Sequence, residues 1–232
     1  MTEPADAPGS SPRITAESIL AELATAWAGA SRVFLRHGLD FCCKGRMSVG
    51  AACAQKGLDT TRVLAELRAE LEPLPDDERW DERPVVQLLA HLVDHFHAGH
   101  RAELPRLLAM AAKVETVHGS KADCPRGLAA HLLQMQQELE EHMQKEEEVL
   151  FPALLAGHDA QVAETIVVLE REHDEHGDSL SAMRRLAHDL VPPPAACGTW
   201  RALYLGLGEL ERDLMQHVHL ENHVLFPRCL SR

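Results

Sequence analysis

The sequence predicts an all-α protein in which a small helical N-terminal domain precedes an antiparallel four-helix bundle. Alternation of apolar and polar residues is almost absent, whereas the strong helix formers Ala, Leu, Glu, Arg and Gln dominate. Proline and glycine clusters divide the later two thirds of the chain into four long segments. These are residues 84–118, 125–155, 159–190 and 198–226. Each can run ~40 Å as a helix, and the short connections favour antiparallel neighbours.

The N-terminal part of the chain predicts a lead followed by a small domain. Residues 1–14 are acidic and rich in Pro and Ser, which predicts disorder. Residues 15–75 contain an amphipathic pattern with Leu20 and Leu23 on one face, followed by SVGAACAQKG and DTTRVLAELRAEL as two further helices. Asp59 or Thr60 is the expected N-cap of the last helix. Between the first helix and these two lies FLRHGLDFCCKG, a turn-like stretch with a vicinal cysteine pair.

The remaining residues, 76–232, predict the bundle. Pro84 and Pro125 lie near helix starts, where a missing backbone N–H costs nothing. Pro105 falls inside the first long helix and is expected to kink it. Three consecutive prolines at 192–194 separate the third helix from the fourth.

Composition excludes several classes of protein. A net charge of −13 and an aromatic content of 4% argue against binding of nucleic acid or of an anionic membrane surface. No apolar run approaches the ~18 residues that cross a bilayer, and the N-terminus lacks the features of a signal peptide. The six cysteines form no CxxC pairs, which predicts reduced thiols and a cytoplasmic protein. The 15 histidines are unusually many, and imidazole is the commonest protein metal ligand.

An internal repeat organises these histidines. The pattern HxxxExxVLFP occurs in the second predicted bundle helix, from His142 and Glu146, and again in the fourth, from His217 and Glu221. The first and third helices share a weaker pattern, HxxHxxxL, which begins at His97 and at His173. The bundle is therefore predicted to contain two copies of a helical hairpin, each with one HxxH helix and one HxxxE helix.

This arrangement predicts a pair of metal ions in the bundle core. Residues four apart on a helix project from the same face, so each His–Glu pair can reach one point in the interior. Buried carboxylates and imidazoles at such density are tolerable only with a strong cation. Two glutamates can each bridge two metals, while four histidines and a bridging oxygen complete about five ligands per ion. Imidazole with carboxylate suits Fe or Mn and is compatible with Zn. His100 and His176 compete with the earlier histidine of their HxxH pairs.

These motifs resemble the hemerythrin-like superfamily, and within it the family that repairs iron–sulfur clusters with a di-iron centre. The pattern HMxKEExxLFP in the second helix, ExEHD in the third and HxxLENxVLFPR in the fourth carry the resemblance, together with the cysteine pair of the leading domain. The resemblance implies two non-haem irons with an oxo or hydroxo bridge and bridging carboxylates. The implied ligands are His97, His142, Glu146, His173, His217 and Glu221. It also implies that Glu138 and Glu172 line a channel.

Two departures favour the repair family over oxygen-carrying hemerythrins. Gly177 stands where those carriers have a further histidine, and the carboxylate of the fourth helix follows its histidine by four residues instead of five. Lys44 replaces a glycine that usually follows the cysteine pair. Cys42 and Cys43 therefore have two readings, as small buried side chains or as a thiol group that exchanges iron or redox equivalents with the bundle site.

The resulting functional hypothesis is repair of iron–sulfur clusters damaged by nitrosative or oxidative stress, through donation of iron. The expected partners are damaged iron–sulfur proteins, with nitric oxide or oxygen species as small ligands, and the expected assembly is a monomer or homodimer. Two alternatives stay open at this point. One is an enzyme that reduces or scavenges nitric oxide at the di-iron site, and the other is a module that senses oxygen or iron.

Overall fold

A computed structural model describes residues 14–72, 74–75 and 79–230. Within these residues every regular element is helical, which confirms the predicted fold class. The chain divides into two compact units, Met1–Leu74 and Pro75–Arg232. None of the described helices is both long and apolar enough to cross a membrane.

Residues 1–13 of the predicted lead lie outside the described residues, but Ile14 does not. Its side chain is buried and its carbonyl oxygen accepts a hydrogen bond of 2.6 Å from Arg68. The ordered small unit therefore includes Ile14, one residue earlier than the predicted boundary.

The described residues of the small unit form four short helices, α1 (Leu20–Ala26), α2 (Ala28–His37), α3 (Val49–Lys56) and α4 (Thr60–Glu70). The Ser48 side chain caps α3, and Asp59 caps α4 by accepting hydrogen bonds from the first backbone N–H groups of that helix. The sequence prediction missed α2, since the stretch read as turn-like is helical up to His37. Gly38 ends α2 with a φ of 62°, a left-handed conformation that glycine adopts without strain.

Helices α2 and α4 cross so closely that only glycine fits at position 29. A Cβ atom there would lie 1.7 Å from the backbone oxygen of Glu70. Around this crossing the unit buries Val33, Phe34 and Leu67 completely.

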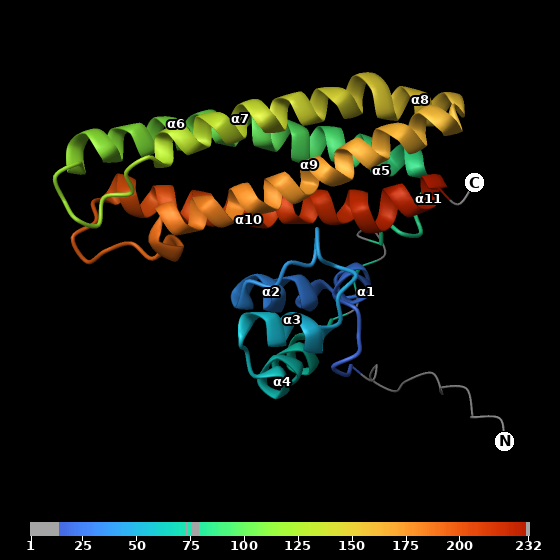
Figure 1. Cartoon of the computed structure of the whole chain (residues 1–232), viewed down its shortest axis with the longest axis horizontal. Coiled ribbons are helices and arrows are strands. Elements are labelled where there is room, and N and C mark those ends of the chain that lie inside the picture. The colour runs from blue at the N-terminus through green and yellow to red at the C-terminus, as the bar shows by residue number, and fades with distance from the viewer. Residues whose placement is uncertain (1–13, 73, 76–78, 231–232) are drawn as a thin grey trace. The chain divides into compact units, whose positions relative to one another are not determined.

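The described part of the bundle consists of four long helical rods, three of which continue through an irregular turn (Figure 1). Their order is α5 (Val85–His91) with α6 (Ala98–His118), α7 (Leu128–Lys145) with α8 (Phe151–Ala156), α9 (Asp159–Leu186), and α10 (Gly198–Leu220) with α11 (Phe226–Leu230). Within three of the rods, a π-helical turn joins the paired helices. The first rod continues through Pro105 without interruption.

The bounds of the bundle helices differ from the predicted segments by more than one residue at three ends. The second rod begins at Leu128, because Pro125 lies in the preceding turn, and the fourth continues to Leu230. The third rod ends at Leu186, since His188, Asp189 and Leu190 all have positive φ angles and form a tight turn before the prolines.

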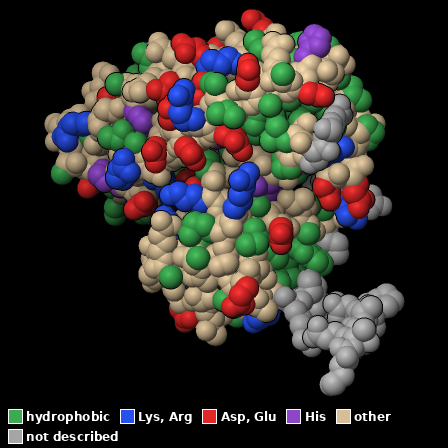
Figure 2. All heavy atoms as spheres, turned by 45° about the vertical axis from the view of Figure 1, so that its right-hand side comes forward, with side chains coloured by type: hydrophobic (Ala, Val, Ile, Leu, Met, Phe, Trp, Pro, Cys, Tyr) green, Lys and Arg blue, Asp and Glu red, His purple; other side chains and the backbone are tan. Residues whose placement is uncertain are grey.

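Apolar side chains fill the bundle interior on both sides of a polar layer. One cluster contains the buried residues Leu88, Leu92, Phe96, Leu150, Phe151, Ile166, Leu169, Val224, Leu225 and Phe226. Along the opposite half of the rods, Leu104, Leu107, Leu132, Met135, Leu139, Met183, Leu203, Leu207 and Leu214 are buried. Acidic and basic side chains intermingle on the face drawn in Figure 2, and few histidines appear there. The histidines buried between the two apolar halves form the polar layer.

Replacement of Gly29 tests the crossing of α2 and α4. We expect Gly29→Ala to lower the free energy of unfolding of the small unit by about 3 kcal/mol, the upper part of the overpacking range, because the clash is with backbone. Differential scanning calorimetry of the full chain measures it.

Gly208→Ala is the matched control in α10. Its added Cβ would meet only Leu190, at an ordinary 3.7 Å. An alanine in a helix interior is favoured over glycine by about 1 kcal/mol, so this variant is expected to keep or raise the stability. Equal effects of the two substitutions would contradict the close crossing.

Candidate metal centre

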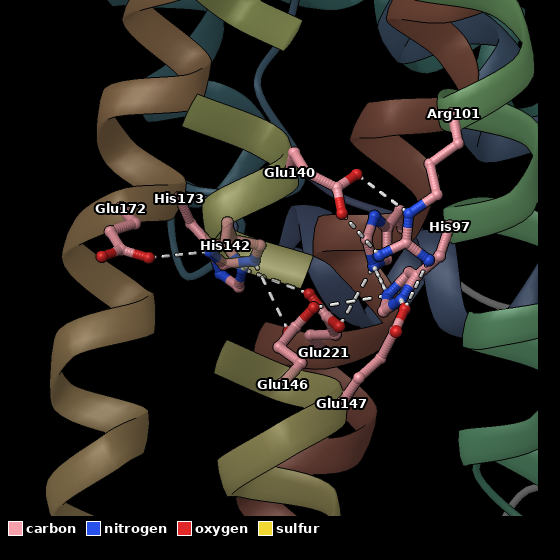
Figure 3. Close-up of polar contacts among 10 residues, drawn as sticks. His97, Arg101, Glu140, His142, Glu146, Glu147, Glu172, His173 and Glu221 are labelled. Carbon is pink, nitrogen blue, oxygen red and sulfur yellow. Dashed lines mark hydrogen bonds and ion pairs between the residues drawn. The ribbon is translucent and has the colours of Figure 1, made fainter. Parts of the chain in front are cut away.

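Six polar side chains from all four rods meet in the polar layer of the bundle. His97 belongs to the first rod, His173 to the third, and a His–Glu pair comes from each of the second and fourth. Figure 3 shows the side chains of His97, His142, Glu146, His173 and Glu221 extending from their helices toward one another. Each of the six is at most 1% exposed: His97, His142, Glu146, His173, His217 and Glu221.

The π-helical turns coincide with this cluster. The first, Leu92–His97, ends at a cluster histidine, and the other two, Glu146–Leu150 and Glu221–Leu225, begin at the cluster glutamates. Such turns insert an extra residue and are frequent at functional sites. Pro152 and Pro227 follow the second and third turns and have no N–H for the carbonyl four residues earlier, which fits a locally widened helix. The LFP tripeptide was therefore the sequence signal for the second and third π-helical turns.

The cluster contains two groups of ligand atoms that share both carboxylates. Site A consists of His97 and His217 with Glu146 and Glu221. The Nε2 atoms of its two histidines are 3.2 Å apart. His97 Nε2 lies 3.3 Å from Glu146 Oε2, and His217 Nε2 lies 3.1 Å from Glu221 Oε1.

Site B consists of His142 and His173 with the same two glutamates. Its histidine Nε2 atoms are 3.1 Å apart. His142 Nε2 lies 3.5 Å from Glu146 Oε1, and His173 Nε2 lies 3.1 Å from Glu221 Oε2. Each carboxylate therefore directs one oxygen toward site A and the other toward site B.

The chemistry of these groups fits bound cations. Within the described part of the chain, neither oxygen of Glu146 accepts a hydrogen bond, although both are buried. A buried carboxylate that accepts no hydrogen bond is costly. Three of the four histidines donate through Nδ1 to an oxygen, which leaves Nε2 as the nitrogen that faces the cluster. Facing lone pairs about 3 Å apart repel each other, and a cation between them removes that repulsion.

Without a cation, protons take part of this role. Burial disfavours a charged ring, but the carboxylates of Glu146 and Glu172 outweigh it and raise the pKa of His142 to about 10. The pKa of His97 is also raised, because Glu146 and Glu147 outweigh the effect of burial. Burial holds the pKa of His217 well below its usual value. Metal binding must displace protons from the rings whose pKa is raised, those of His97 and His142. We therefore expect metal binding to strengthen as the pH rises.

Charged residues outside the cluster orient two of the histidines. His97 Nδ1 donates to Glu147 over 2.7 Å, and Arg101 holds the same carboxylate oxygen over 2.8 Å. His142 Nδ1 donates to Glu172 over 3.0 Å, and Lys145 holds the other oxygen of that carboxylate over 2.8 Å. Figure 3 shows both carboxylates reaching the outer edges of the two rings.

We call the contacts that each ring makes on its Nδ1 side, away from the cluster, its outer contacts. The other two histidines have weaker outer contacts. His173 Nδ1 donates to the amide oxygen of Asn222 over 2.7 Å. Among the described residues, Nδ1 of His217 has no hydrogen-bond partner. Aromatic rings also pack on both imidazoles: Phe226 stacks on His173 and Phe96 on His217, with ring centroids 5.7 and 5.3 Å apart.

These outer contacts were not predicted from the sequence. Glu172 was expected to line a channel, and in the structure it is tied to His142 and Lys145. Glu138, the other predicted channel residue, is half-buried and accepts a hydrogen bond from Gln134. One signal in the sequence could have identified two of these outer partners, because Glu147 and Asn222 directly follow the cluster glutamates in the chain.

His100 and His176, the competing histidines of the HxxH pairs, lie beside the two sites. Both are buried, and the Nε2 atoms of both lack hydrogen-bond partners within the described residues. The His100 ring packs on His217 with centroids 5.3 Å apart, and the His176 ring packs edge-on against His142 at 4.9 Å. Neither belongs to the two groups of ligand atoms.

The vicinal cysteines lie in the small unit, in a loop organised by Asp40. The carboxylate oxygen Oδ1 of Asp40 accepts hydrogen bonds from the backbone N–H groups of Cys42 and Cys43. The two Sγ atoms are 3.6 Å apart, well beyond a disulfide bond length of ~2.05 Å. The hydrogen bond with Cys43 and burial raise the pKa of the Cys42 thiol well above its usual value.

The fold and the cluster together define a helical-bundle protein with a buried cation site. Comparisons with known proteins agree with this class. Residues 88–229 match the family model described as "Hemerythrin HHE cation binding domain", and residues 16–71 match one described as "Domain of Unknown function (DUF542)". The chain belongs to the hemerythrin HHE family, and this membership indicates that the bundle binds non-haem iron.

Full-length relatives share both parts of the chain. A protein of Pectobacterium carotovorum (strain PC1) is 46% identical over 215 residues, which cover 91% of this chain and 96% of the relative. A protein of Yersinia pestis (strain Pestoides F) is 44% identical over 211 residues, with the same coverage. Both relatives carry the name iron-sulfur cluster repair protein YtfE.

Removal of the shared carboxylates tests the centre. We expect a Glu146→Ala, Glu221→Ala double variant to lose nearly all bound metal, because each site then keeps only its two imidazoles as ligands. Metal analysis and optical spectra of the purified full chain measure the loss. A Glu138→Gln variant is the control and is expected to retain metal, while full metal content in the double variant would refute the shared-carboxylate geometry.

Proposed function

We propose that sites A and B each hold one iron ion, bridged by Glu146 and Glu221, and that the protein donates iron to damaged iron–sulfur clusters. The observation that carries this proposal is the division of each buried carboxylate between two histidine pairs. The comparison with known proteins also supports the proposal, because the name of the two relatives describes repair of iron–sulfur clusters.

The donor set favours transfer of iron toward a cluster protein. Imidazole nitrogen and carboxylate oxygen are harder ligands than thiolate or sulfide, which bind iron in iron–sulfur proteins. Each site offers four protein atoms, two nitrogens and two oxygens, so an ion that prefers six ligands keeps positions that another molecule can occupy. An incoming thiolate can therefore begin to bind the iron before the imidazoles release it.

The stress that calls for this repair is part of the proposal. We propose that the damage is caused by nitric oxide and reactive oxygen species, which attack iron–sulfur clusters. The proposed partners are the proteins that carry the damaged clusters. Within the chain, the carboxylates Glu147 and Glu172 set the orientation of His97 and His142, and so control how readily the two sites release their cargo.

Transfer of labelled iron tests the proposed function. Anaerobic full-length protein loaded with ⁵⁷Fe is mixed with an apo iron–sulfur enzyme, sulfide and a thiol, and we expect label in the rebuilt cluster and recovery of enzyme activity. The Glu146→Ala, Glu221→Ala variant, treated in the same way, is expected to restore little activity. If the loaded protein keeps its label and the enzyme stays inactive, donation is refuted.

A further inference from the structure

We propose that the two ions are not equivalent and that the ion of site A, between His97 and His217, is the one released first. This inference rests on the proposed function, since it requires an ion in each site. It is carried by the difference between the outer contacts of the four histidines.

The outer contacts of site B are complete, and those of site A are not. In site B, His142 donates to Glu172 and His173 donates to Asn222, at 3.0 and 2.7 Å. In site A, His97 donates to Glu147 at 2.7 Å, but Nδ1 of His217 has no hydrogen-bond partner among the described residues. Such outer contacts fix the tautomer and orientation of a ligating ring and raise its basicity.

The missing contact makes ion binding at His217 less favourable. Nε2 can hold a cation only when the neutral ring carries its proton on Nδ1. In the cation-free cluster, Nε2 of His217 lies 3.1 Å from Glu221 Oε1 and can donate its proton there. Binding of an ion at site A therefore breaks this hydrogen bond and moves the proton to a buried nitrogen without an acceptor. A buried donor without a partner costs free energy, and only site A bears this cost.

Site A also lies beside two clefts. His100, whose ring packs on His217, is 2% exposed, and its Nε2 has no hydrogen-bond partner among the residues that the structure describes. It lines a cleft of about 460 Å³ between α6 and α7, and a second of about 340 Å³ between α6 and α10. Carboxylates occur along both: Glu140 and Glu141 in the first, and Glu103, Glu209 and Asp213 in the second.

These clefts give a departing cation a route with suitable ligands. An ion that leaves His217 meets the adjacent His100 ring and then carboxylate oxygens, and both kinds of ligand bind Fe²⁺. Arg101 stands at the first cleft and holds both Glu140 and Glu147. It neutralises part of the acidic lining and keeps Glu147 on His97, so it slows release by this route.

Crystallography of half-depleted protein tests the order of release. The full chain is loaded with two equivalents of iron and exposed to a ferrous chelator until one equivalent has left, and crystals are then measured at the iron absorption edge. We expect the remaining anomalous density between His142 and His173. Density between His97 and His217, or equal density at both sites, would overturn the inference while leaving two-iron binding intact.

Release kinetics of matched Glu→Gln variants provide an independent test. The wild-type protein is expected to lose its iron to excess chelator in two phases of equal amplitude. Mutation of such an outer partner typically weakens metal binding 10–100-fold. Glutamine can still accept the Nδ1 hydrogen bond but lacks the charge that raises the basicity of the ring, so Glu172→Gln should accelerate the slow phase by up to that factor, and Glu147→Gln the fast phase. Glu175→Gln, at an exposed position of α9, is the control and should change neither.

The outcomes separate this inference from the proposed function. A wild-type protein that releases both ions in one phase, or a Glu172→Gln variant that accelerates only the fast phase, refutes the order of release alone. A wild-type protein that never binds a second equivalent refutes the two-ion centre and the inference with it. Thermal unfolding of each variant confirms that an altered rate is not due to unfolding.

Discussion

Burial of two carboxylates among four imidazoles is the constraint on which the rest of this structure depends. Glu146 and Glu221 are completely buried, in a layer where water cannot replace the lost hydration of their charges. Two cations, or protons in their place, resolve this cost. No single helix can bring six such groups to one point, and here four rods contribute them. Apolar side chains on either side of the layer hold the rods together.

The local structure of the helices serves the same constraint. A regular α-helix places residues four apart on one face, which suffices for each His–Glu pair. The π-helical turns at the glutamates change the direction of the residues that follow, so Glu147 and Asn222 reach the outer edges of His97 and His173. Phe151 and Phe226, from the same LFP tripeptides, stack on those two imidazoles. One short motif therefore supplies a shared carboxylate, an outer contact and an aromatic neighbour in each half of the bundle.

The near-repeat of the two halves makes their differences informative. Both halves use histidine, glutamate and phenylalanine in the same register, yet the outer contacts of the four imidazoles differ. They are a carboxylate held by arginine, a carboxylate held by lysine, an amide and, for the fourth, no hydrogen bond within the described residues. Small differences of this kind tune metal affinity without any change of ligand. The small unit differs in kind, since its core surrounds short capped helices and its thiols lie in a loop arranged by Asp40.

The sequence by itself determined the fold class and the two His–Glu pairs of the cluster, because helical periodicity and a repeated HxxxE pattern depend on residues close together in the chain. In the first and third helices the repeat left both histidines of each HxxH pair open, and the family resemblance favoured His97 and His173, which the structure brings into the cluster. The sequence did not reveal α2, which packs against α4 at a crossing that admits only glycine at position 29, a contact between residues far apart in the chain. It could not reveal the partners of the imidazoles, since Arg101 and Glu147 lie far apart in the chain and meet only across two packed helices. Tertiary structure alone decided which histidine lacks an outer contact, because that depends on what the packed rods place beside each ring.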